Sequence, residues 1–277
     1  MATTQKAASP TKKNQGFQGI RAAFWVIVVC LLIAILIYNL LLGNPSNFAG
    51  NDPAGHPTNL LGTIYKGGIV VPVIHTLLLT VIALSIERWL ALNTAFGKGS
   101  LAKFVANIKA AIAKNNFDEA QKLCDKQRGS VANVVSASIR AYKDMETATG
   151  LKKAQKVAKI QQAHEEATQL EMPTLQMNLP ILATIVTLGT LTGLLGTVIG
   201  MIRSFQALAA GGGGDSLALS TGISEALINT AFGILTSWCS VIAYNTFTNK
   251  IDKLTYALDE VGYSIAQTYE ANHTEEA

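Results

Sequence analysis

Charged residues are scarce in this sequence. Only 14% of its 277 residues are Asp, Glu, Lys or Arg, while 49% are hydrophobic. Soluble domains carry about 25% charged residues. The shortage therefore argues against a protein that folds wholly in water, and the hydrophobic excess favours a membrane protein.

The sequence also lacks the patterns that indicate catalysis or metal binding. Its three cysteines, Cys30, Cys124 and Cys239, are far apart and fit no CxxC spacing. We interpret them as small apolar residues, with neither a disulfide framework nor a zinc site. We find no His, Cys or Asp cluster, no phosphate-binding loop and no nucleophile motif. We therefore predict no enzyme, no catalytic residue, no metal and no cofactor, and we expect the lipid bilayer rather than nucleic acid as a partner.

Four long hydrophobic runs are present, at residues 22–42, 67–87, 178–203 and 219–248. Each is long enough to cross the hydrocarbon core, which takes about 20 apolar residues in a helix. The first run follows basic residues, as a signal peptide does, but it exceeds about 15 residues and no Ala-x-Ala type site follows, so we expect an uncleaved helix. The predicted fold class is all-α: a polytopic membrane protein with four transmembrane helices.

The distribution of Lys and Arg predicts the topology. The tail 1–21 holds four of them and no acid, the segment 88–177 holds fourteen, and residues 43–66 hold Lys66 alone. Basic residues accumulate on the cytoplasmic side of spans. We therefore expect residues 1–21, 88–177 and 249–277 to be cytoplasmic, and the loops 43–66 and 204–218 to be periplasmic.

The predicted cytoplasmic segments have helical patterns. Apolar residues recur at helical spacing in two stretches, and residues 151–170 are rich in strong helix formers. We expect residues 151–170 to continue as one long helix into the third span, with bends at Pro173 and Pro180. Residues 250–267 should continue the fourth span inward. The apolar faces fit either a bundle within one chain or packing between copies. The recurring residues are Leu101, Phe104, Val105, Ile108 and Ile112, then Ile251, Leu254, Leu258, Val261 and Ile265.

The third span combines glycines with hydroxyls. Its glycines form two small-xxx-small pairs, which let helix backbones approach closely. Its threonines include Thr190 and Thr197, which share one helix face. Each hydroxyl could serve an ion pathway, or could bond a carbonyl of its own helix. The glycines are Gly189, Gly193, Gly196 and Gly200.

The fourth span carries Glu225, Asn229 and Thr230. We interpret Glu225 as the only carboxylate within a span, because the second run is uncharged as far as Ile86; such groups are functional candidates. If the third and fourth spans form a hairpin about the glycine-rich loop 211–215, Thr197 and Thr230 lie at one level. Arg203 can then approach Glu225, so an ion pair and a proton-handling role both stay open.

Two motifs on these spans carry a resemblance. Residues 193–198 read GLLGTV and residues 222–227 read GISEAL, followed by Thr230 and Ala231. In these motifs the sequence resembles the MotA/TolQ/ExbB proton-channel family, and its ExbB branch most. The resemblance implies a pentamer whose long helices extend into a cytoplasmic helical domain, with the third and fourth spans lining a central pore. A dimer of single-span, ExbD-like partners, each with an aspartate, would occupy that pore, and ion flow would drive its rotation.

The resemblance also implies roles for residues. Thr197 and Thr230 match the pore-facing threonines and Glu225 the family's glutamate, and we add Thr190 and Asn229 to the expected ion pathway. The implied function is a subunit of the bacterial inner membrane that energises transport across the outer membrane through a TonB-like protein. The TolQ-type envelope complex and the MotA-type flagellar stator are the alternatives. The extra first span, Arg203 and Asn229 depart from the family pattern.

Overall fold

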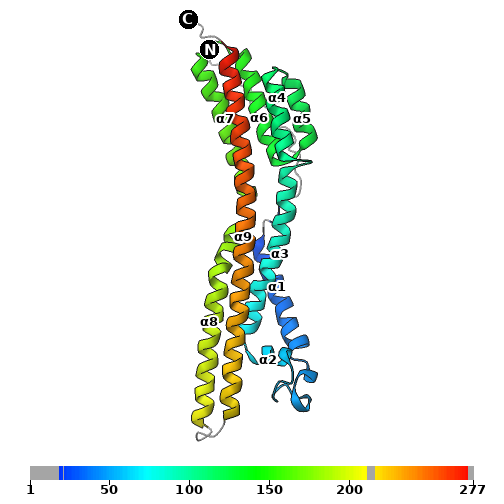
Figure 1. Cartoon of the computed structure of the whole chain (residues 1–277), viewed down its shortest axis with the longest axis vertical. Coiled ribbons are helices and arrows are strands. Elements are labelled where there is room, and N and C mark those ends of the chain that lie inside the picture. The colour runs from blue at the N-terminus through cyan, green and yellow to red at the C-terminus, as the bar shows by residue number, and fades with distance from the viewer. Residues whose placement is uncertain (1–18, 21, 211–215, 274–277) are drawn as a thin grey trace, which may run out of the picture. The chain divides into compact units, whose positions relative to one another are not determined.

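The computed structural model describes residues 19–20, 22–210 and 216–273 (Figure 1). The basic residues of the N-terminal tail, Arg21 and the glycine-rich loop 211–215 lie outside the described residues. Every named element is helical. In chain order they are α1 Ala23–Leu36, the π-helix η1 Ile37–Leu42, the 3-10 turns η2 Pro45–Asn47 and η3 Ala49–Asn51, α2 Leu60–Lys66, α3 Val70–Phe96, α4 Leu101–Ala113, α5 Phe117–Gln127, α6 Gly129–Thr147, α7 Lys153–Leu175, α8 Leu179–Ala210 and α9 Ser216–Asn272.

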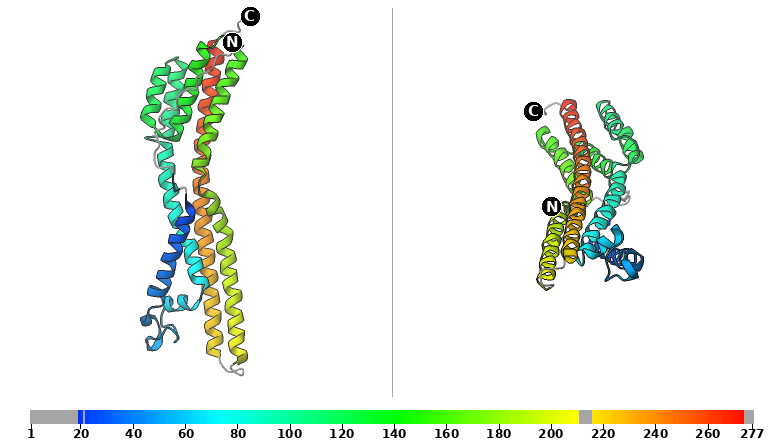
Figure 2. Two further views of the ribbon diagram at one scale, coloured as in Figure 1. Left: turned by 180° about the vertical axis from the view of Figure 1, so that it is seen from behind. Right: turned by 60° about the horizontal axis from the view of Figure 1, so that its bottom comes forward.

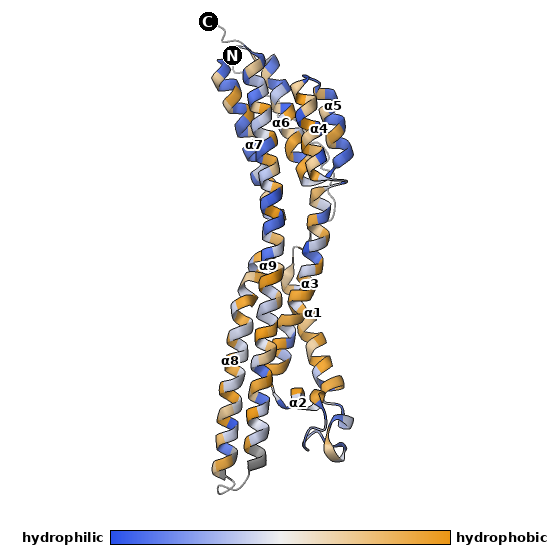
Figure 3. Ribbon diagram, in the orientation of Figure 1, coloured by the Kyte–Doolittle hydropathy of each residue, from blue (hydrophilic) through white to orange (hydrophobic). Residues whose placement is uncertain are grey.

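Four of these helices are long and apolar enough to cross a membrane: α1 with η1, α3, α8 and α9. The predicted number of spans and the all-α class are confirmed. Figure 3 shows hydrophobic residues along α1 and α8, whereas α5 and α7 carry many hydrophilic ones. Phe24, Trp25 and Leu40 of the first span are more than half exposed, as side chains that face lipid are.

The chain divides into two compact units. The spanning unit comprises Ile20–Arg88 and Asn178–Thr248. Among the described residues, the bundle unit comprises residues 89–177 and 249–273, together with Gly19. Helices α3 and α9 each contribute residues to both units.

In the spanning unit, α8 and α9 lie side by side along their length (Figures 1 and 2). The segment between α1 and α3 is held by asparagine side chains. Asn59 caps α2 by accepting a hydrogen bond from Gly62 N at 2.9 Å, and Asn47 Nδ2 donates to Leu41 O at 2.8 Å. These bonds satisfy backbone groups that a helix end leaves open. Near them, the side chains of Leu42, Ile64 and Val71 form a small core on which Phe232 of α9 packs.

In the bundle unit, α4 to α7 pack with the end of α9. The predicted apolar faces are confirmed as buried, except that Leu101 is half-buried, and the face of α9 from Ile251 to Ile265 is buried within one chain. Asn116 accepts a hydrogen bond from Glu119 N at 3.1 Å. This cap starts α5 at Phe117.

The predicted continuous helix from 151 into the third span is wrong. Helix α7 ends at Leu175 and α8 begins at Leu179. Between them Asn178 has φ +64°, a left-handed conformation that asparagine tolerates better than most residues and that ends a right-handed helix. Pro180 then lies in the first turn of α8, where its missing N–H costs nothing.

The loop expected at 204–218 is also shorter than predicted. Helix α8 extends to Ala210 and α9 begins at Ser216. Residues 204–210 contain no glycine or proline that would stop the helix before Ala210.

Candidate functional site in the α8–α9 helix pair

Glycines bring α8 and α9 into close contact. A Cβ on Gly193 would lie 3.1 Å from Gly233 Cα, and one on Gly200 would lie 2.7 Å from Ala226 Cβ. All four glycines that the sequence singled out, including Gly189 and Gly196, face α9 in this way. Gly233 meets them from the α9 side and was not singled out, because it has no second glycine at helical spacing. The two backbones approach more closely than any larger residue would permit.

Hydroxyl groups bridge the two helices. Thr230 Oγ1 donates to Gly193 O at 3.0 Å, and Thr190 Oγ1 lies 2.8 Å from Ser237 Oγ. Ser240 Oγ donates to Leu182 O at 2.7 Å. Each bond satisfies a polar group that lipid cannot hydrogen-bond. The helix pair is therefore joined by hydroxyl bonds as well as by packing.

Thr197 is placed differently from Thr230. Its Oγ1 donates to Leu194 O of its own helix at 2.6 Å, and its side chain is half-exposed. Thr230 is bonded to Gly193, one helical turn from Thr197. Because each hydroxyl proton is donated to a carbonyl, the lone pairs of each oxygen remain to accept a hydrogen bond. The side chain of Thr197 is therefore open to an outside donor.

Asn229 lies inside the chain. It is 3% exposed, its Nδ2 donates to Gly67 O at 3.1 Å, and it packs against Gly196. Among the described residues, its Oδ1 has no hydrogen-bond partner. No sequence pattern predicts this contact, because Gly67 is far from Asn229 along the chain.

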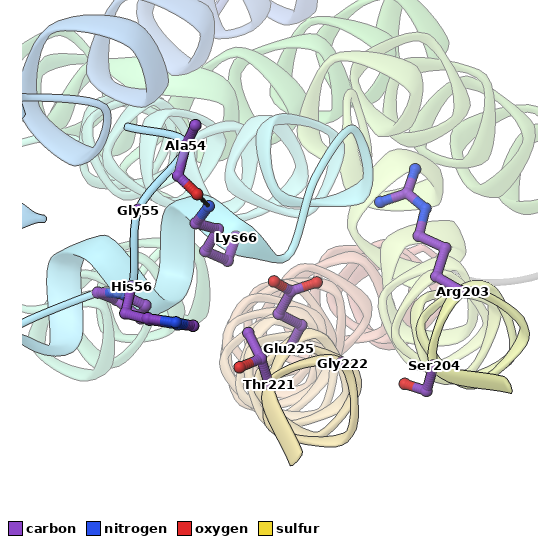
Figure 4. Close-up of a pocket in the computed structure, with 10 residues that line it drawn as sticks. Ala54, Gly55, His56, Lys66, Arg203, Ser204, Thr221, Gly222 and Glu225 are labelled. Atoms are coloured by element: carbon purple, nitrogen blue, oxygen red, sulfur yellow. Dashed lines mark hydrogen bonds between the residues drawn. The ribbon is translucent and has the colours of Figure 1, made fainter. Parts of the chain in front are cut away.

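Glu225 lines a pocket of about 250 Å³ (Figure 4). Arg203, Lys66 and His56 line the same pocket. Lys66 Nζ donates to Ala54 O at 3.0 Å, and a Cβ on Gly68 would touch the Arg203 guanidinium at 2.7 Å. Within the described residues, no ion pair of 4.0 Å or less joins Arg203 to Glu225. Sequence reasoning missed Lys66 and His56, since both come from the segment before α3.

A second carboxylate corrects the interpretation of Glu225 as the only one within a span. Glu87 of α3 is 4% exposed and accepts hydrogen bonds from Arg88 Nε at 2.6 Å, Ile20 N at 2.9 Å and Asn178 Nδ2 at 3.2 Å. Asn178 Nδ2 also lies 3.2 Å from Ile20 O. A buried charge is tolerated when it is paired and hydrogen-bonded in this way. The cluster joins the start of α1 to α3 and α8.

A protein-family model matches the region that contains the helix pair. Residues 126–260 match the model of the MotA/TolQ/ExbB proton channel family. This range contains both sequence motifs, the α8–α9 pair and Glu225.

Individual relatives match parts of the chain. A putative biopolymer transport protein, ExbB-like 3 of Synechocystis sp., is 37% identical over 87 residues, which are 31% of this chain and 41% of that protein. The Tol-Pal system protein TolQ of Pseudomonas aeruginosa is 27% identical over 206 residues, which are 71% of this chain and 86% of TolQ. The biopolymer transport protein ExbB of Helicobacter pylori is 39% identical over 80 residues, 29% of this chain and 55% of that protein.

Proposed function

We propose that this chain is the channel-forming subunit of a complex driven by the proton-motive force, because residues 126–260 match the model of the MotA/TolQ/ExbB proton channel family. The observation that carries the proposal is the α8–α9 pair, which is closely packed through glycines and holds Thr197 half-exposed. Several copies of the chain, five on the family pattern, would surround a pore that these two helices line.

The pore residues of the chain would need a titrating partner. Thr190, Thr197 and Thr230 offer hydroxyls, which hydrogen-bond but do not exchange protons at ordinary pH. An aspartate on a single-span partner helix would supply the missing group. With their own protons donated to carbonyls, the threonine oxygens accept from the protonated acid, and a rotated hydroxyl donates to the carboxylate. Such weak and exchangeable contacts allow a partner helix to turn in the pore.

We assign the chain to the ExbB type, with an ExbD-like partner and a TonB-like protein that transmits the energy to the outer membrane. The GLLGTV and GISEAL motifs support this branch. A TolQ-type role is the second candidate, because the match to TolQ covers 86% of that protein. The location that fits both is the bacterial inner membrane, with both termini cytoplasmic as the Lys and Arg distribution predicts.

Copurification tests the partner model. The chain, extracted from its native membrane in mild detergent, should carry a smaller protein with one span and an aspartate near the start of that span. The mass of the complex should equal several copies of the chain with fewer copies of the partner. Recovery of the chain as a monomer without such a protein would contradict the proposal, and a partner with a peptidoglycan-binding domain would assign the chain to the MotA type.

Substitutions at Glu225 and Arg203 should be nearly independent. Because no direct ion pair joins the two side chains, we expect the effects of Glu225→Gln and Arg203→Gln on thermal stability to couple by less than about 1 kcal/mol, through the charge interaction across the pocket that both line. We expect Glu225→Gln to lower gradient-dependent activity while the complex still assembles. If the double variant instead recovers much of the stability lost by each single variant, the two residues act as an ion pair.

A further inference from the structure

A histidine in the bundle unit is buried without a partner for one ring nitrogen. His164 of α7 is 7% exposed, and its Nδ1 lies 2.9 Å from Ser138 Oγ of α6. Its Nε2 is buried and, among the described residues, has no hydrogen-bond partner. Buried ring nitrogens are normally satisfied by protein or water, so this site is unusual in the chain.

Helix α9 covers the unpartnered nitrogen with a glycine. A Cβ on Gly262 would lie 2.5 Å from His164 Nε2 and 2.6 Å from Cδ2. The imidazole therefore fills the space that a side chain on α9 would occupy. Three helices, α6, α7 and α9, meet at this one ring.

The hydrogen bonds define which form of the ring fits. Ser138 Oγ has a single proton and lies 3.0 Å from Val134 O, to which it donates. His164 Nδ1 then donates to Ser138 Oγ, and Nε2 carries only a lone pair. A protonated imidazole would place a second N–H at Nε2, directed at Gly262, where none of the described residues offers an acceptor.

The surrounding charges only partly oppose this preference. Burial lowers the pKa of His164 from its ordinary value of 6.5, although the carboxylates of Asp259 on α9 and Glu165 on α7 act to raise it. On α6 the group that faces the ring is the Ser138 hydroxyl. The unfolded chain binds the proton of His164 more tightly than the folded chain does. The contribution of His164 to the free energy of unfolding is therefore fully present above about pH 6.5 and is lost as the pH falls below that value.

We infer that His164 is a pH-sensitive contact: protonation at Nε2 loosens the packing of α9 on α6 and α7. The same α9 helix carries Thr230 in the spanning unit. The inference goes beyond the proposed function. In the proposed orientation, protons that pass through the pore arrive on the side of the bundle unit. Local acidification would therefore loosen this unit.

Hydrogen–deuterium exchange on the full chain in lipid nanodiscs tests the inference. After correction for the intrinsic pH dependence of exchange, peptides around Ser138, His164 and Gly262 should exchange several-fold faster at about pH 5.5 than at about pH 7.5, the range in which histidine titrates. The variant His164→Gln, which cannot be protonated, should lose this difference. The control His273→Gln, which alters another histidine of the bundle unit, should keep it.

Two outcomes would overturn the inference: equal exchange of the wild type at both pH values, or an unchanged pH effect in His164→Gln. A direct titration covers the case in which that variant does not fold. A chain with His56, His75 and His273 replaced by Gln leaves His164 as the single histidine for NMR. Its imidazole should titrate below 6.5, over the same pH range as the faster exchange, and titration at or above 6.5 would contradict the inference.

Discussion

Leucine at position 193 should separate α8 from α9. A Cβ on Gly193 would already lie 3.1 Å from Asn229 O and from Gly233 Cα, so a leucine side chain meets backbone that cannot rotate away. We expect the free energy of unfolding to fall by about 3 kcal/mol or more, which is the upper range for overpacking. Gly193→Ala should have an intermediate effect. The melting temperature of the purified chain and the yield of oligomer in detergent measure the change.

Ala209→Leu is the matched control, because it adds the same side chain to α8 at an exposed residue. It should melt like the wild type. If Gly193→Leu also melted like the wild type, the close contact between α8 and α9 would be contradicted. A normal melting temperature with no oligomer would instead place the glycine at a contact between copies.

Valine at position 197 should abolish activity without preventing assembly. The substitution keeps the side-chain volume and removes the hydroxyl that is open to the partner's aspartate. A hydrogen bond to a charged group contributes about 1.5–3 kcal/mol, so we expect gradient-dependent activity to fall at least about tenfold. Thr197→Ser, which keeps the hydroxyl, should be milder. Activity is measured in cells that depend on the chain, together with the amount of copurified partner.

Thr192→Val provides the comparison. Thr192 lies on the same helix, is half-buried as Thr197 is, and donates to Leu188 O of its own helix at 2.6 Å. If Thr197 only bonded its own backbone, the two valine variants would behave alike and both would be nearly silent. Normal activity of Thr197→Val would therefore contradict the pore assignment, and loss of the copurified partner would show a role in assembly.

Features that repeat with a helical period were predicted correctly from the sequence. The four candidate spans, the buried faces of α4 and α9 and the continuation of α9 beyond the fourth span all follow from local spacing, which reports which side of a helix is apolar. The glycines of α8 were recognised for the same reason. The surface of α9 that they contact was only partly predictable, because Gly233 has no second glycine at helical spacing.

Features that depend on contacts between distant segments were not predictable. The break between α7 and α8 contains Asn178 in a left-handed conformation, which helix propensities do not reveal. The Glu87 cluster needs Ile20 and Asn178, and the buried position of Asn229 needs Gly67. Each brings together groups far apart in the chain, so single-sequence patterns contain no signal for them.

Proton flux through proteoliposomes tests whether the chain and its partner form a proton channel. Vesicles that contain the chain with its copurified single-span partner are given a pH difference and a membrane potential, and the internal pH is followed with a trapped dye. We expect the pH difference to collapse faster in these vesicles than in vesicles that contain the chain alone. Replacing the partner's aspartate by asparagine should remove this acceleration. A rate equal to that of empty vesicles, with the intact complex present, would contradict the account.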